Sequence, residues 1–301
     1  MNRIILLALS FCLLGFSGKA FSGESVDSAD ETVELDSVAL YLAAIDSVNN
    51  SFDYQTGTVT IGDGLATINV PEGYKFLDAK QAEYVFTELW GNPPSETLGM
   101  LLKADKGPLD DDTYFVGISF DEEGYVEDED AQDMDFEELL ETMQSDMEEV
   151  NEARKAQGYD AVELVGWAAE PFYDAKAKKL HWAKELRFEG NDVNTLNYNI
   201  RILGRKGYLE LNAISDVKIL PQVQNDVDKV LASVNFNEGH RYSDFNPSID
   251  KVAAYGIGGL IAGKVLAKAG FLSVLAKFGK FIFIGIAGLF ALVRKKIFGG
   301  E

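Results

Sequence analysis

Residues 195–214, TLNYNIRILGRKGYLELNAI, decide the fold class. They contain two runs rich in strand-forming residues, 195–203 and 208–214, joined by the four-residue turn Gly204-Arg205-Lys206-Gly207. A connection this short joins antiparallel neighbours. The stretch therefore predicts a β-hairpin and, with it, an antiparallel sheet.

The rest of the chain repeats this strand pattern and adds a few helices. Short β-rich runs bounded by turn residues predict further strands at 56–61, 65–70, 98–104, 114–120, 161–169, 179–188 and 234–236. Helical apolar spacing predicts helices at 33–48, 78–90, 135–158 and 220–232. Asp78 is expected to cap the second of these, with Gln81 completing a capping box. The fold class predicted is α+β, an antiparallel sheet covered by helices.

Residues 1–20 have the features of a signal peptide. Arg3 precedes an apolar run at 4–16, and Gly18-Lys19-Ala20 has small residues at the positions that a signal peptidase recognises. We expect cleavage after Ala20. The alternative is a lipoprotein signal at Cys12, but bulky Phe11 stands where that signal needs a small residue. Because Cys12 is the chain's only cysteine, the mature chain is expected to lack disulfides, thiol catalysis and cysteine-based zinc sites.

Charge divides the remaining chain into an acidic linker (21–32), a soluble acidic domain (33–245) and a C-terminal membrane-associated segment (246–301). Residues 20–250 contain 48 acidic and 17 basic residues, a net charge of −31, whereas residues 251–301 contain eight basic residues and one acid. A surface this negative repels phosphate backbones, so nucleic acid is excluded as a partner. Cationic partners, metal ions or a salty medium stay open.

The C-terminal segment is expected to anchor the protein in a membrane. Its apolar runs, 252–263 and 281–293, are each shorter than the roughly twenty residues that a helical span needs. If its flanking lysines snorkel, a helix over 277–294 spans a thin bilayer and leaves the basic cluster at 294–296 in the cytoplasm. The alternative is a helical hairpin that turns at 277–280. Small residues spaced as Gly-x-x-x-Gly within this segment also allow self-association.

Six short motifs in the chain point to a known family. They are Gly124-Tyr125-Val126-Glu127-Asp128, Asn151-Glu152-Ala153-Arg154, Val165-Gly166-Trp167-Ala168-Ala169-Glu170-Pro171, Asn197-Tyr198-Asn199, Leu203-Gly204-Arg205-Lys206-Gly207 and Asp250-Lys251-Val252-Ala253-Ala254-Tyr255-Gly256. From about Thr56 onward the chain resembles the bacterial membrane-anchored proteins grouped as domain-of-unknown-function family 2167. The resemblance implies a C-terminal membrane anchor and brings no known activity, cofactor or catalytic residue. Residues 67–74 and 230–236 are also similar to PsbP-like domains, which concerns the fold alone.

Few residues are candidates for chemistry. His181 is expected to be exposed on a strand, where it shares a face with Glu185, and His240 is expected to be exposed in a loop without a recognisable partner. No nucleophile elbow or phosphate-binding loop is present in the sequence. The acids between Asp121 and Asp135 resemble a cation site, but their spacing does not fit an EF-hand, and a charge run is more often a solvated face.

Weak ligand-binding candidates are Trp167, Glu170, Tyr173 and Trp182, because aromatic rings beside carboxylates suit amphipathic or cationic ligands. The simpler interpretation is that the tryptophans fill the core. Arg205 is added because it is a basic residue at a hairpin tip in an acidic domain.

These features predict a non-enzymatic envelope protein of the bacterial inner membrane, whose acidic domain binds a protein partner or a ligand on the periplasmic or external side. One alternative is an enzyme with a carboxylate-based site, for which Glu170 and Asp174 are the candidates. The other is a cation-binding or scaffold module that uses the acidic stretch 107–153, which contains nineteen acids and no Lys or Arg.

Overall fold

The computed structural model describes residues 29–92, 94–110, 112–132, 134–156, 160–190 and 192–263. The chain divides into two units, residues 1–44 and 45–301, which are described separately. The described part of the first unit is helical and belongs to α2 (Ala29–Asn49), which ends within the second unit and confirms the expected helix at 33–48. The expected signal peptide and the span at 277–294 lie outside the described residues.

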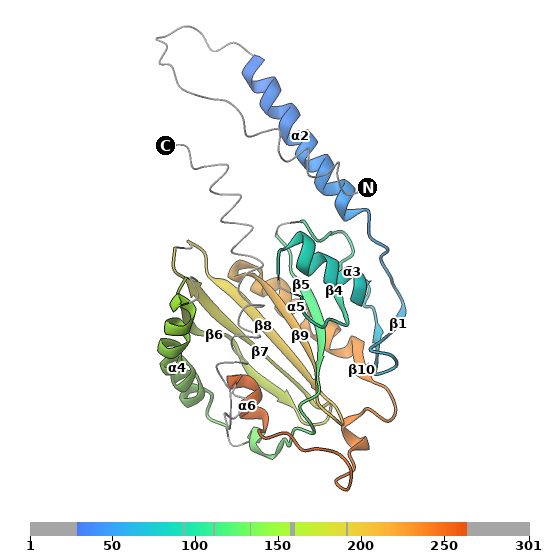
Figure 1. Ribbon diagram of the computed structural model, residues 1–301, viewed down its shortest axis with the longest axis vertical. Coiled ribbons are helices and arrows are strands. Elements are labelled where there is room, and N and C mark those ends of the chain that lie inside the picture. The colour runs from blue at the N-terminus through green and yellow to red at the C-terminus, as the bar shows by residue number, and fades with distance from the viewer. Residues whose placement is uncertain are drawn as a thin grey trace. The chain divides into compact units, whose positions relative to one another are not determined.

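The second unit is built on two antiparallel sheets, which confirms the α+β class (Figure 1). Among the described residues the larger sheet has the strand order β3 (Tyr74–Asp78), β4 (Gly99–Lys103), β5 (Phe115–Asp121), β9 (Tyr208–Asp216), β8 (Thr195–Leu203), β7 (Lys179–Phe188) and β6 (Val162–Asp174). The smaller sheet has the order β1 (Thr58–Ile61), β2 (Ala66–Asn69) and β10 (Val234–Phe236). The hairpin expected from residues 195–214 forms β8 and β9 in the centre of the larger sheet.

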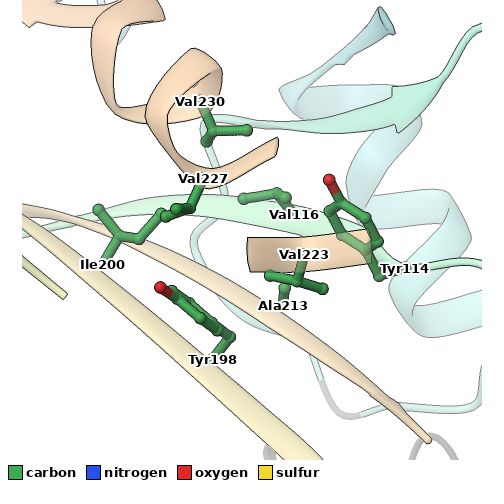
Figure 2. Close-up of a pocket in the computed structure, with 8 residues that line it drawn as sticks. All are labelled: Tyr114, Val116, Tyr198, Ile200, Ala213, Val223, Val227 and Val230. Atoms are coloured by element: carbon green, nitrogen blue, oxygen red, sulfur yellow. The ribbon is translucent and has the colours of Figure 1, made fainter. Parts of the chain in front are cut away.

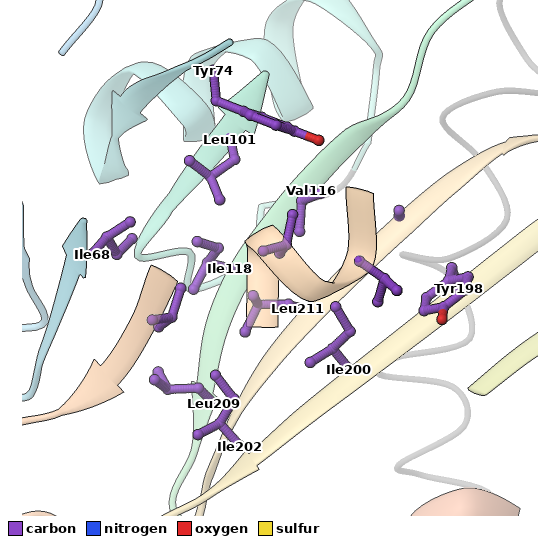
Figure 3. Packing of buried hydrophobic residues seen from close by; sticks show 14 of the residues in the cluster. Ile68, Tyr74, Leu101, Val116, Ile118, Tyr198, Ile200, Ile202, Leu209 and Leu211 are labelled. Atoms are coloured by element: carbon purple, nitrogen blue, oxygen red, sulfur yellow. The ribbon is translucent and has the colours of Figure 1, made fainter. Parts of the chain in front are cut away.

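Helix α5 (Leu220–Ser233) covers one face of the larger sheet (Figure 3). Side chains alternate between the two faces of a strand, so every second residue of β8 and β9 points toward this helix. Apart from Ser215, these residues are all apolar or aromatic: Leu196, Tyr198, Ile200, Ile202, Leu209, Leu211 and Ala213. Their burial against the valines of α5 forms the main hydrophobic core.

The opposite face of the sheet is covered near its two ends. At the β3–β5 end lie α3 (Ala79–Tyr84) and the π-helical turn Val85–Leu89, whose Phe86 packs against Gly117. At the β6–β7 end lie α4 (Phe136–Ala156) and α6 (Ile257–Ala262). No helix among the described residues is long and apolar enough to cross a membrane.

Two elements differ from the sequence-based prediction. Strand β3 was not predicted, because the turn Pro71-Glu72-Gly73 before it and the helix cap Asp78 at its end leave only five residues for it. Strand β6 was expected to end at 169 but continues to Asp174. It contains Pro171 and several register shifts, which an edge strand tolerates because one side of its backbone is unpaired.

The cap of α3 forms as expected, but the capping box does not. The Asp78 side chain accepts a hydrogen bond from the Gln81 amide at 2.9 Å. The Gln81 side chain instead accepts a hydrogen bond from the Asp53 amide at 2.7 Å and donates one to the Asp53 carbonyl at 3.1 Å. It therefore fastens the start of α3 to the segment before β1.

Candidate functional site

Asp128 lies at the centre of a polar network, near the middle of the acidic stretch 107–153. One of its carboxylate oxygens accepts hydrogen bonds from Tyr173 at 2.5 Å and Lys178 at 2.6 Å, and the other accepts one from Tyr242 at 2.9 Å. Burial raises the pKa of Asp128, but the hydrogen bonds from these three side chains outweigh burial and leave the pKa below its usual value. Asp128 is therefore ionised at neutral pH and joins β6, the β6–β7 turn and residue 242.

Two residues close to Asp128 in the sequence, Tyr125 and Asp130, form hydrogen bonds with residues 251–258 near the end of the described chain. The backbone of Tyr125 pairs with the backbone around Val252. The Tyr125 amide donates to the Lys251 carbonyl, and the Tyr125 carbonyl accepts from the Ala253 amide, both at 2.8 Å. Asp130 accepts hydrogen bonds from the first amides of α6, Ile257 at 2.9 Å and Gly258 at 3.0 Å. We call Tyr125, Asp128 and Asp130 the acidic clamp.

The clamp places α6 in a hydrophobic cluster. Ile257 and Ile261 are completely buried, and Leu260 is 5% exposed. Their cluster contains Leu180 and Trp182 of β7. The folded region therefore extends at least to Ala262, beyond the boundary at residue 245 that the sequence suggested.

Three of the candidate ligand-binding residues share this cluster. Trp182 is 1% exposed, as the core interpretation predicted. Trp167 is half-buried and donates a hydrogen bond through its indole nitrogen to the Phe136 carbonyl at 3.1 Å, which ties β6 to the start of α4. Tyr173 contacts the cluster and donates to Asp128. Trp182 is therefore part of the core, and Trp167 and Tyr173 pack against the same cluster at its edge.

The remaining candidates are spread over the surface. Glu170 is exposed on β6. Asp174 accepts hydrogen bonds from the Lys176 and Ala177 amides, both at 2.9 Å, and so stabilises the β6–β7 turn. Arg205 forms a two-pronged ion pair with Asp250, at 2.7 and 3.1 Å. Arg205 therefore holds the chain that leads to α6.

The two histidines differ from each other. His240 is exposed, as expected, in a turn whose backbone bonds to Arg205. His181 was expected to be exposed but is half-buried, with its Nδ1 at 2.9 Å from the Tyr198 hydroxyl. The prediction for His181 was wrong because its face of β7 is the α5 side of the sheet, where β8 brings Tyr198 next to it. Burial lowers the pKa of His181, although Asp228 acts in the opposite direction.

Four of the acids between Asp121 and Asp135 have separate structural roles. Asp121 accepts a hydrogen bond from Tyr208 at 3.0 Å, and Asp135 accepts from the first amides of α4, Glu137 at 3.0 Å and Glu138 at 3.1 Å. Asp128 and Asp130 belong to the clamp. Within the described parts of the chain, no group of three or more His, Cys, Asp or Glu residues is arranged to hold a metal ion.

The face of the sheet opposite α5 contains a feature that sequence reasoning missed. Its central strands present polar residues where a core would be apolar: Asn197, Asn199 and Arg201 of β8, Glu210 and Asn212 of β9, and Lys184 of β7. We call these six residues the polar patch. Asn197 and Asn199 are 4% exposed and Arg201 is 8% exposed. Buried polar groups are costly unless they are hydrogen-bonded, so the partners of these side chains decide what the patch can do.

Part of the polar patch is satisfied internally. One terminal nitrogen of Arg201 donates a hydrogen bond to Glu210 at 2.9 Å. The other donates to the Asn212 side chain at 3.2 Å and to the Ile200 carbonyl at 3.0 Å. Glu210 also accepts from Asn212, and Asn199 donates to the Asn197 side chain at 2.6 Å. The single carboxylate of the patch is therefore already shared by Arg201 and Asn212.

A small apolar cavity lies on the α5 side of the sheet (Figure 2). Valines of α5 and residues of β5, β8 and β9 line it, with Tyr114 and Tyr198 at its edge. Tyr114 donates a hydrogen bond to Asp226 at 2.9 Å, and Lys103 pairs with the same carboxylate. The cavity is part of the main core and has no converging set of charged groups.

The model of the family described as "Protein of unknown function (DUF2167)" matches residues 53–292. The chain belongs to this family. No curated protein matches it. The acidic clamp, the polar patch and α6 all lie within the range that matches DUF2167.

A solved structure with some likeness is the solution structure of cyanobacterial PsbP (CyanoP) from Synechocystis sp. PCC 6803. The match has 14% sequence identity, covers 61% of this DUF2167 chain and 92% of the CyanoP chain, and has a TM-score of 0.34. At that score the PsbP-like fold suggested by the sequence stays a prediction.

Proposed function

We propose that this DUF2167 protein is a membrane-anchored accessory module of the bacterial envelope, which binds a partner or a ligand without catalysing a reaction. Its acidic domain faces the periplasm or the exterior, and its basic C-terminal segment holds it to the inner membrane. The family contributes no activity to this proposal, which rests on the chain itself.

The acidic clamp is the observation that supports the proposal most strongly. It fixes α6 to the folded domain, and the next lysine of the basic C-terminal segment, Lys264, is two residues beyond the end of this helix. Only fourteen residues, 263–276, separate the end of α6 from the expected span at 277–294, so the anchor holds the domain close to the bilayer without a long linker. The charge distribution agrees, because the acidic body is repelled by anionic lipid whereas the basic tail is attracted to it.

The enzymatic alternative has less support. Glu170 is exposed, and Asp174 is occupied by backbone amides of a turn. A general acid or base needs a position near a reacting group and a pKa suited to proton transfer. Hydrogen bonds from the Ala177 and Lys176 amides hold the pKa of Asp174 below its usual value, which does not suit that role.

Membrane fractionation tests the proposal. We expect the full chain to stay in the membrane pellet after a carbonate wash and to be released by detergent. Alkaline phosphatase fused after Glu301 should be inactive and a fluorescent protein at the same position should be fluorescent, because the single span places that end in the cytoplasm. Recovery of the full chain in the soluble fraction would contradict the proposal. An active phosphatase fusion would replace the single span by the hairpin.

A further inference from the structure

Helix α2 contains a section that is apolar on every side. Residues 39–45 read ALYLAAI, and because they make about two helical turns, apolar side chains point in all directions around the helix axis. Residues 39–44 are all exposed, and Leu40, Tyr41 and Leu42 are 73%, 61% and 53% exposed. No other run of the described chain exposes three large apolar side chains in succession. We call residues 39–45 the apolar section.

The contacts that hold α2 do not use the apolar section. Asn49, the last residue of the helix, is 8% exposed, donates a hydrogen bond to the Asp110 side chain at 2.8 Å and accepts one from the Leu109 amide at 3.0 Å. The Tyr54 hydroxyl donates to the Asn49 carbonyl at 2.6 Å. These contacts are polar and belong to the last turn, so they give no reason for the apolar section. A helix that is apolar on all sides is normally covered, and an exposed apolar patch marks an interaction site.

The charge of α2 distinguishes between the surfaces that could cover it. Residues 29–49 contain five acids and no Lys or Arg. A second copy of the chain would bring the same acids together, and its acidic body would add to the repulsion. An anionic bilayer repels the helix for the same reason, and the basic C-terminal segment is assigned to the membrane in the proposed function. An apolar surface with basic residues around it fits both the apolar section and the acids.

We propose that the apolar section of α2 docks in an apolar groove, rimmed by Lys and Arg, on a partner protein of the envelope. Helices bind in such grooves through side chains three and four residues apart. Tyr41, Leu42 and Ile45 have this spacing and form one stripe of the helix, and the exposed Asp46 next to it can pair with a base on the rim. The inference rests on the proposed function and names the surface and the partner chemistry that the module uses.

Photo-cross-linking of the full chain, in the cells that naturally produce it, tests the inference. The photoreactive residue p-benzoylphenylalanine replaces Tyr41 in one variant and, as the control, Tyr84 of α3, which is 50% exposed, in another. We expect an adduct of discrete mass with a second protein from the Tyr41 variant and no such adduct from the Tyr84 variant. Mass spectrometry of the digested adduct identifies the cross-linked peptide. A peptide of the same chain, from a second copy or from the C-terminal segment, or an adduct with lipid alone would overturn the inference.

Substitutions in the Tyr41 cross-linking variant test the chemistry of the groove. Leu42→Ser should lower the adduct yield about tenfold, because the burial of a leucine side chain is lost. Asp46→Lys should lower it about fivefold, since the new cation faces the basic rim, whereas the same charge reversal at Glu148 on α4 should leave it unchanged. All three positions are exposed, so the melting temperatures should match that of the unsubstituted chain and separate loss of docking from loss of folding.

The outcomes for this surface and for the proposed function can be told apart. No adduct at Tyr41, equal adducts at Tyr41 and Tyr84, or equal yields in the Asp46→Lys and Glu148→Lys variants would overturn the inference. A chain that stays in the membrane pellet but forms no adduct would overturn the inference alone, whereas recovery of the chain in the soluble fraction would contradict the proposed function.

Discussion

Replacing Asp128 by Asn tests whether the acidic clamp holds α6 in place. The substitution preserves the size of the side chain and removes its charge. In the wild type the carboxylate accepts from Tyr173, Lys178 and Tyr242. The Lys178 side chain is 30% exposed, so its ion pair is discounted for solvent screening. The two tyrosine bonds to a charged acceptor then dominate, and losing their charge assistance should cost about 3 kcal/mol.

Hydrogen exchange of the full chain measures this loss directly. The Leu260 amide donates to the Gly256 carbonyl at 3.2 Å within α6, so it exchanges when the helix detaches. A loss of about 3 kcal/mol speeds that exchange roughly 100-fold. The matched control, Glu148→Gln, removes an exposed charge from α4 and should leave the exchange rate unchanged. Equal exchange rates in the two variants would refute the role of Asp128 in the clamp.

The same residue gives a pH dependence. The pKa of Asp128 in the folded state is below its ordinary value of 3.8 because its hydrogen bonds outweigh burial. The unfolded state therefore binds the proton more readily, so the stabilisation is present above about pH 4 and is lost as the pH falls below it. The Asn variant has no carboxylate at this position and should lack this part of the acid sensitivity.

Three further predictions concern the core, a turn and the signal peptide. Tyr114→Phe removes the hydrogen bond to Asp226 and should lower the free energy of unfolding by about 2 kcal/mol in urea titrations, and an unchanged midpoint would contradict this. Gly207→Ala should destabilise the protein by more than about 2 kcal/mol, because the added methyl group would lie 1.8 Å from the Asp121 carbonyl oxygen. Gly166→Ala, with no atom within 4 Å, should be nearly neutral, and similar melting temperatures for the two glycine variants would refute the explanation. The intact mass of the purified protein should begin at Phe21, and a mass that retains Met1 or a lipid on Cys12 would show that the expected cleavage is wrong.

Local patterns were sufficient to predict much of the fold. Strands β7 and β8 begin and end at the expected residues, because their turn signals and their β-rich composition agree. Helix α4 begins one residue after the expected start and ends close to Gly158. The edge strands were harder, since β3 is short and β6 continues through a proline.

The functional features depend on contacts that a local pattern does not contain. The clamp joins Asp130 to Ile257, which is 127 positions away in the sequence. The polar patch did leave a signal, because Asn197 and Asn199 are polar residues at alternate positions of an expected strand. Only the register of β7 against β8 places Lys184 beside them.

Cysteine labelling in whole cells tests the central claim, that the acidic domain lies outside the cytoplasm and is anchored by the C-terminal segment. Because Cys12 lies in the expected signal peptide, a Glu170→Cys variant has a single cysteine, exposed on β6, after cleavage. A membrane-impermeant maleimide should label it in spheroplasts before lysis, whereas a Glu301→Cys variant should be labelled only after lysis. Labelling of Glu170→Cys only after lysis would place the domain in the cytoplasm and contradict the account.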